Sequence, residues 1–198
     1  MFTGIIQEVG TLGRMERSGG LVRLTVHAPK TASRVRPLES VAVDGVCLTV
    51  VRVREAALTF EVIRETQTLT SLGHLRTGDR INLEPSLSVT DRFNGHILFG
   101  HIDGVGTVIR RRQLMGELIL EIRLAPVLRK FLVPKGPVTV DGVSVTVGKD
   151  VGASTFTVHL IPETLRQTTL GSRNIGNRVN LELDYFAKLI WQFTGGRS

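Results

Sequence analysis

Short runs in which apolar and polar residues alternate cover most of the chain. Residues 21–28 read LVRLTVHA, residues 40–54 read SVAVDGVCLTVVRVR, and residues 57–63 read ALTFEVI. These runs are rich in Val, Leu, Ile and Thr and end at Gly, Asp or Pro, a pattern typical of half-buried β-strands. The pattern predicts a chain that is mostly β.

The same series of strands is written twice. Residues 43–49 (VDGVCLT) match residues 140–146 (VDGVSVT) at an offset of 97, and residues 4–11 (GIIQEVGT) match residues 100–107 (GHIDGVGT) at an offset of 96. A third match, ending at Glu84 and Glu182, has an offset of 98. The slow drift needs only single-residue insertions, so the repeat indicates two domains of the same fold, each with its own core.

We expect about six strands in each copy, the copies being residues 1–90 and 91–183 with a linker at 85–95. Six short strands favour a small closed β-barrel, which removes sheet edges and leaves a mouth for a ligand. Helices are predicted at 125–132, after the ET pairs ending at 66 and 164, and at 184–193. The final segment, 184–198, carries an apolar helix for which a partner subunit is the expected cover.

An Asp-Gly pair lies between apolar runs in both copies, at Asp44-Gly45 and at Asp141-Gly142. This is the arrangement expected of a tight hairpin that needs positive φ. Because side chains alternate along a strand, Cys47 and Thr49 are expected on one face of the first barrel. Ser144 and Thr146 are expected at the matching place in the second.

Composition excludes several classes of protein. The chain is 41% apolar and 22% charged, so it has enough apolar residues for ordinary cores and resembles no disordered segment. Its net charge of +7 would attract polyanions, but the arginines are scattered and there is one Trp and one Tyr, which disfavours nucleic-acid binding. The chain shows no signal peptide or membrane span, and its single cysteine fits a reducing compartment, so we expect a cytoplasmic protein.

Few residues suggest chemistry by spacing alone. His96 and His101 are five apart and are not expected to converge on one metal ion. Cys47 has no histidine nearby in sequence, which favours a buried structural cysteine over a nucleophile. The copies differ, however, where they otherwise match, with pairs Ile5 and His101, Thr3 and Phe99, Cys47 and Ser144, and Arg64 and Pro162. Such differences fit a protein that holds two related ligands in two roles.

Several motifs together resemble riboflavin synthase of the α-subunit type over essentially the whole chain. They are MFTGI at the N-terminus, DGVCLTV, GHIDG from Gly100, DGVSVTV, HLIPETLRQTTLG from His159, and the paired endings INLE and VNLE. The resemblance implies two six-stranded Greek-key barrels and a C-terminal helix that assembles a homotrimer. It also implies conversion of two molecules of 6,7-dimethyl-8-ribityllumazine into riboflavin and 5-amino-6-ribitylaminouracil by four-carbon transfer, without cofactor or metal.

The resemblance implies one substrate in an N-terminal barrel and the other in the C-terminal barrel of a neighbouring subunit. Which barrel binds the donor is open, as is association with lumazine synthase. The site residues implied in the N-terminal half are Phe2, Thr3, Gly4, Ile5, Ile6, Ser40, Cys47, Leu48, Thr49, Glu61, Val62, Ile63, Arg64, Glu65 and Thr66. Those in the C-terminal half are Gly100, His101, Ile102, Lys135, Ser144, Val145, Thr146, His159, Leu160, Ile161, Pro162, Glu163 and Thr164.

The reaction needs a base for the acidic C7 methyl group, and only histidine titrates near neutral pH without a perturbed environment. Our hypothesis is that His101, with Thr146, assists proton transfer in the second barrel, where Ser144 is a further catalytic candidate. Cys47 and Ser40 would shape and hydrogen-bond the other substrate. Phe99 and Pro137 depart from the family's usual polar residues beside the site. A non-catalytic lumazine- or flavin-binding protein of the same fold remains the alternative.

Overall fold

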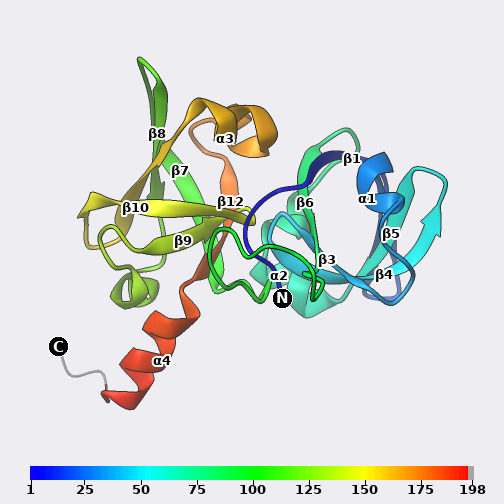
Figure 1. The fold of residues 1–198 in the computed structure, drawn as a ribbon, viewed down its shortest axis with the longest axis horizontal. Coiled ribbons are helices and arrows are strands. Elements are labelled where there is room, and N and C mark those ends of the chain that lie inside the picture. The colour runs from blue at the N-terminus through cyan, green and yellow to red at the C-terminus, as the bar shows by residue number, and fades with distance from the viewer. Residues whose placement is uncertain (196–198) are drawn as a thin grey trace.

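The structure, a computed structural model, describes residues 1–195 and consists of two closed antiparallel barrels side by side (Figure 1). The first barrel has the strand order β1-β2-β5-β4-β3-β6 and the second β10-β11-β8-β7-β12-β9, which is the same cyclic order. The predicted duplication and the six strands per copy are confirmed. The strands are β1 Glu8–Ser18, β2 Leu21–His27, β3 Ser40–Val43, β4 Val46–Arg54, β5 Ala57–Val62, β6 Arg80–Pro85, β7 Gly104–Leu114, β8 Glu117–Arg123, β9 Pro137–Val140, β10 Val143–Val151, β11 Thr155–Leu160 and β12 Arg178–Leu183.

Helices are short and lie outside the barrels. The α-helices are α1 Pro29–Ala32, α2 Arg64–Leu69, α3 Pro162–Gln167 and α4 Tyr185–Phe193, and the 3₁₀ helices are η1 Ser71–His74, η2 Pro126–Phe131 and η3 Thr169–Ser172. The helix predicted at 125–132 is a 3₁₀ segment, and α1 was not predicted. Four residues are too few to predict a helix from sequence, because helical periodicity needs several turns to show. No helix within residues 1–195 has the length and apolar character needed to cross a membrane.

The two Asp-Gly hairpins have the predicted backbone. Asp44 and Asp141 have φ of 43° and 47°, and Gly45 and Gly142 have φ of 82° and 78°. Val43 pairs with Val46, and Val140 with Val143, so each turn has two central residues with positive φ, the geometry that matches strand twist. The sequence therefore fixes where β3 turns into β4, and β9 into β10.

Apolar side chains fill both barrel interiors. Leu48 and Val50 point into the first core together with residues of the other five strands, and Val143 and Val147 do so in the second. Cys47 and Thr49 alternate with these residues and lie on the outer wall, as do Ser144 and Thr146. Cys47, Thr49, Ser144 and Thr146 therefore line the outside of each barrel and not a mouth that opens into its interior, because six strands enclose only enough space for their own side chains.

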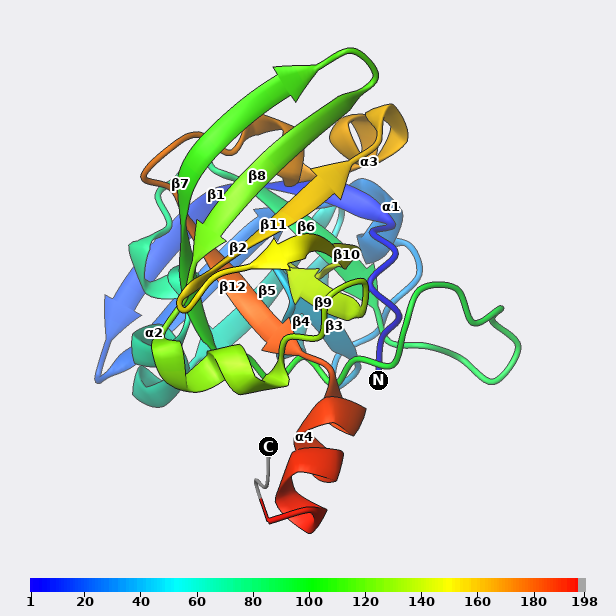
Figure 2. The same ribbon diagram turned by 90° about the vertical axis from the view of Figure 1, so that its left-hand side faces the viewer.

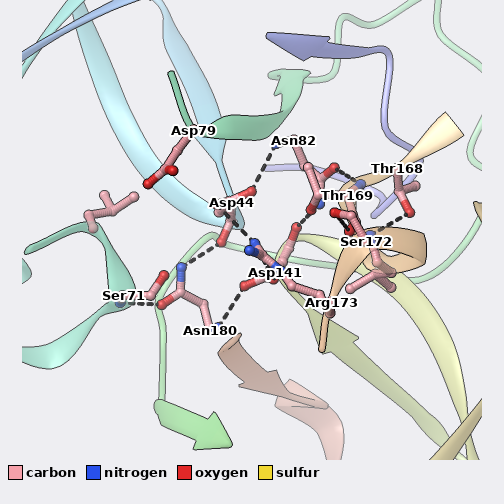
Figure 3. Close-up of polar contacts among 12 residues, drawn as sticks. Asp44, Ser71, Asp79, Asn82, Asp141, Thr168, Thr169, Ser172, Arg173 and Asn180 are labelled. Atoms are coloured by element: carbon pink, nitrogen blue, oxygen red, sulfur yellow. Dashed lines mark hydrogen bonds and ion pairs between the residues drawn. The ribbon is translucent and has the colours of Figure 1, made fainter. Parts of the chain in front are cut away.

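A polar cluster joins the barrels about an approximate two-fold axis (Figure 3). The Asn180 side chain accepts a bond from the Ser71 amide at 2.7 Å and donates to the Asp44 carbonyl at 2.8 Å. The Asn82 side chain repeats this with the Thr169 amide at 2.8 Å and the Asp141 carbonyl at 2.9 Å. Because the bonds are reciprocal and buried, they fix the relative placement of the barrels.

Candidate functional site

Each barrel receives the segment that precedes the other barrel. The Ser144 amide, on β10, donates to the Gly4 carbonyl at 2.9 Å, and the Cys47 amide, on β4, donates to the Gly100 carbonyl at 2.9 Å. Residues 4–6 therefore lie against the second barrel and residues 100–102 against the first. Ile6 packs against the second core and Ile102 against the first, which supports the same exchange.

This exchange corrects the grouping predicted from sequence. We expected Gly4, Ile5 and Ile6 beside Cys47, and His101 beside Thr146. The structure instead attaches the segment that carries His101 to the strand of Cys47, and residues 4–6 to the strand of Ser144. The repeat showed which residues correspond between copies, but correspondence does not reveal which copy a segment packs against.

Glycine is required where the segments cross. Gly4 has φ of +80° and Gly100 has φ of +74°, a region that disfavours other residues. A Cβ at Gly4 would lie 2.6 Å from the Cβ of Ser144, and one at Gly100 would lie 2.6 Å from the Cβ of Cys47. Close approach and backbone conformation both explain the glycines of MFTGI and GHIDG.

A glutamate at the end of each barrel holds the crossing segment. Glu84 accepts the amides of Thr3 and Gly4 at 2.7 and 2.9 Å, and Glu182 accepts those of Phe99 and Gly100 at 2.8 and 3.0 Å. Burial raises the pKa of both carboxyl groups above the ordinary glutamate value, and the amide bonds oppose that rise. These carboxylates close the paired endings INLE and VNLE, so their role is to anchor the segments.

The Cys47 site, as we name it, comprises Ser40, Cys47 and Thr49 with the segment 100–102. Ser40 is the register partner of Thr49, and Ala42 that of Cys47. Phe2, Ala42 and Leu98 form a small buried apolar cluster against which the partly buried Cys47 packs. The thiol therefore has an apolar flank, which fits packing and shaping better than activation as a thiolate.

The Ser144 site comprises Thr139, Ser144 and Thr146 with His96 and residues 4–6. His96 Nδ1 lies 2.7 Å from Ser144 Oγ, and His96 Nε2 lies 3.3 Å from Thr139 Oγ1. Burial lowers the pKa of His96, an effect that Asp184 partly opposes, so the neutral imidazole is favoured. A neutral imidazole hydrogen-bonded to a hydroxyl can take up or pass on a proton.

His96 is not among the site residues predicted from the sequence. One signal could have found it: His96 lies only five residues before His101 and four before the GHIDG motif that the resemblance rests on. A second signal is that the first barrel has Ala42 where the second has Thr139. The strand partners of Cys47 and Ser144 thus differ in polarity.

The remaining candidates flank the two sites. Residues 61–66 and 159–164 each run from the end of a strand, β5 or β11, into the first turn of a helix, α2 or α3. Glu61 pairs with Arg23 at 2.7 Å, and His159 with Glu117 at 2.9 Å. Lys135 is exposed in the turn before β9, with φ of 65°. Within residues 1–195, no group of three or more His, Cys, Asp or Glu side chains could hold a metal ion.

The model of the Lumazine binding domain family matches residues 3–86 and 99–184, one match for each barrel. Riboflavin synthase of Actinobacillus pleuropneumoniae is 40% identical over 193 residues, covering 98% of this chain and 89% of that protein. The chain belongs to the riboflavin synthase family. Riboflavin synthase of Bacillus subtilis (strain 168) is 38% identical over 193 residues, with the same shares covered.

Solved structures agree with the two-barrel fold. The crystal structure of LumP complexed with riboflavin has a TM-score of 0.87 and 24% identity, covering 93% of this chain and 100% of LumP. LumP complexed with 6,7-dimethyl-8-(1'-D-ribityl) lumazine has a TM-score of 0.84 and 25% identity, covering 93% and 99%. The paired barrels are thus shared by this riboflavin synthase family member and a protein that has been crystallised with two related ring systems.

Proposed function

We propose that this chain is a riboflavin synthase that converts two molecules of 6,7-dimethyl-8-ribityllumazine into riboflavin and 5-amino-6-ribitylaminouracil by transfer of a four-carbon unit. One observation carries the proposal. The chain builds two sites of the same backbone design, each completed by the other copy's segment, with Cys47 in one and the Ser144–His96 pair in the other. Such a pair suits a reaction that uses one molecule twice in unlike roles.

Each site would bind one flat ring system, and we retain residues 1–90 and 91–183 as the two lumazine-binding units. At the Cys47 site, His101 would assist proton transfer, and Cys47 and Ser40 would shape the pocket. At the Ser144 site, Ser144, Thr146 and His96 would supply hydroxyl and imidazole groups. Residues 61–66, 159–164 and Lys135 would contact the substrates. Holding two rings in register replaces a bimolecular encounter, which can supply much of the rate.

We further propose that the two half-sites which face each other belong to different subunits of a homotrimer. The support is α4: its Phe186, Ile190 and Phe193 are 54%, 64% and 83% exposed, an apolar face that a second copy could cover. The free thiol of Cys47 fits a cytoplasmic enzyme. Association with lumazine synthase, which would supply the substrate, belongs to the same proposal.

The test is incubation of the purified protein with 6,7-dimethyl-8-ribityllumazine alone, followed by riboflavin fluorescence. Riboflavin should accumulate with half of the lumazine consumed appearing as the uracil product. Stable lumazine binding without riboflavin would instead support the non-catalytic carrier.

Sedimentation of the full chain and of a variant that ends at residue 183 tests the trimer: the full chain should sediment as three copies and the shortened variant should not.

A further inference from the structure

Residues 99–103, which deliver His101 to the Cys47 site, are fastened to α4. The Lys188 ammonium lies 2.9 and 2.8 Å from the two carboxylate oxygens of Asp103, and the Leu183 amide donates to Asp103 Oδ2 at 2.7 Å. The Asp103 amide in turn donates to the Leu181 carbonyl at 2.8 Å. The segment and the root of the helix therefore form one bonded unit.

The first copy has no such connection. Gln7 occupies the position of Asp103, and the chain beyond Glu84 continues as the linker, which forms no helix. At the position of Phe99 stands Thr3, whose hydroxyl donates to Glu84 at 2.8 Å. The segment that carries His101 is thus attached to α4, which extends away from the barrels (Figure 2).

Phe99 bridges the helix and the histidine. Its ring meets Tyr185, the first residue of α4, edge-on at 4.9 Å between centroids and 62° between planes. Its other neighbour is His101, at 6.1 Å and 26°. Phe99 belongs to none of the buried core clusters within residues 1–195, so these two rings are its characteristic contacts. Aromatic pairs of this kind restrict orientation beyond what burial alone would do.

The geometry points to Phe99 as a positioning residue that, held by Tyr185, fixes the ring of His101 at the Cys47 site and so couples the placement of α4 to catalysis. The inference rests on the proposed function, since it gives His101 a role in turnover. Catalytic groups work only when their rotamers are locked by their surroundings, and small misplacements cost large factors in rate. The helix would then serve the site as well as any subunit contact.

The experiment measures kcat and KM of Phe99→Ala, Tyr185→Ala and the double variant, all in the full-length chain, and compares them with the wild-type values. Each single change should lower kcat about tenfold, because His101 loses its fixed orientation. KM should stay within about twofold, and the double variant should be no slower than either single one, as expected for residues acting through one contact. Phe99→Tyr and Tyr185→Phe, which keep both rings, should retain most of the wild-type kcat.

Phe131→Ala is the matched control. Phe131 makes the other edge-on contact with α4, to Trp191 at 5.7 Å and 80°, and that contact leads to no candidate site residue. The control should therefore keep the wild-type kcat. If Phe131→Ala slowed turnover as much as Phe99→Ala, a general loosening of α4 would be responsible and the inference would be wrong. Unchanged kcat in Phe99→Ala, or additive losses in the double variant, would also overturn it.

A second measurement does not depend on activity. The ring-proton resonance of His101, assigned by its loss in His101→Gln, should move in Phe99→Ala and in Tyr185→Ala but stay in place in Phe131→Ala. If the wild type makes no riboflavin, the proposed function fails, while this resonance still reports whether Phe99 and Tyr185 hold His101. If the resonance stayed in place in both Phe99→Ala and Tyr185→Ala, the coupling would be refuted even in an active enzyme.

Discussion

At the scale of residues, the two copies place unlike groups on the same backbone positions. Cys47 and Ala42 stand where the second copy has Ser144 and Thr139, and the serine hydroxyl lies 2.7 Å from a histidine, His96. The matched amide bonds to Gly4 and Gly100 keep the backbones alike. The difference between the sites is therefore chemical, which is what a reaction with two roles for one substrate requires.

His101→Gln should lower kcat by about a hundredfold if the imidazole transfers a proton, because glutamine can hydrogen-bond but does not titrate. Lumazine binding, followed by the change in its fluorescence, should remain. Wild-type turnover in this variant would remove His101 from the mechanism.

In contrast, Cys47→Ser should keep most of the activity. Complete loss of activity with lumazine binding intact would mean that the thiol does more than shape the pocket.

The contact between His96 and Ser144 can be tested by a double-mutant cycle. If the pair acts as one unit, Ser144→Ala and His96→Gln should each reduce kcat by about tenfold or more, and the double variant by little more than either. Cys47→Ala in the first barrel is the matched change at the corresponding position. If the two single losses in kcat multiplied in the double variant, Ser144 and His96 would act independently and their contact would have no role in turnover.

At the scale of elements, the sequence predicts what is local. Period-2 alternation and the Asp-Gly pairs located the strands and the two hairpins, and the offset between copies gave six strands each. What it could not give is the partner of a segment outside the strands. Residues 98–102 carry no periodicity, and their attachment to Cys47 depends on a glycine approach across the barrels that no local pattern encodes.

Gly100→Ala should destabilise the protein by more than about 2 kcal/mol, since the new Cβ would meet Cys47 at 2.6 Å in a backbone with φ of +74°. Gly116→Ala is the matched control, because Gly116 has φ of +83° but no atom within 4 Å of the added Cβ. It should cost only the conformational penalty of about 1 kcal/mol. Urea unfolding of both variants gives the comparison, and equal losses would mean that the close approach is unimportant.

At the scale of the whole molecule, one arginine serves two buried aspartates at the junction of the barrels. Arg173 donates to Asp141 from Nε at 2.8 Å and from Nη2 at 2.7 Å, whereas its nearest nitrogen is 3.5 Å from Asp44 Oδ2, which has no hydrogen-bond partner among residues 1–195. Leu75 occupies the position of Arg173 in the first copy, so the two-fold arrangement lacks its second arginine. The two copies therefore share their backbone at the junction of the barrels, but two aspartates lie there with only one arginine between them.

Burial, with the charge of Asp141 adding to it, raises the pKa of Asp44 to about 8. An unfolded aspartate ionises near pH 4, so between about pH 4 and pH 8 the folded protein holds a proton that the unfolded chain has lost. More protons bound in the folded state mean that the free energy of unfolding falls as pH rises through this window, by at most about 1.4 kcal/mol per pH unit from one group. Above pH 8 this contribution is exhausted.

Asp44→Asn should remove that slope, because asparagine can still accept the Asn82 amide through its oxygen while carrying no charge to desolvate. Its free energy of unfolding should therefore match or exceed that of the wild type at pH 8 and depend less on pH between 5 and 7, as measured by urea unfolding. Asp150→Asn, which removes the same charge at an exposed position, should keep the wild-type slope. Equal slopes in Asp44→Asn and the wild type would mean that the proton responsible for the slope is not held by Asp44. Glu84 and Glu182 also have raised pKa values and contribute a slope of the same sign.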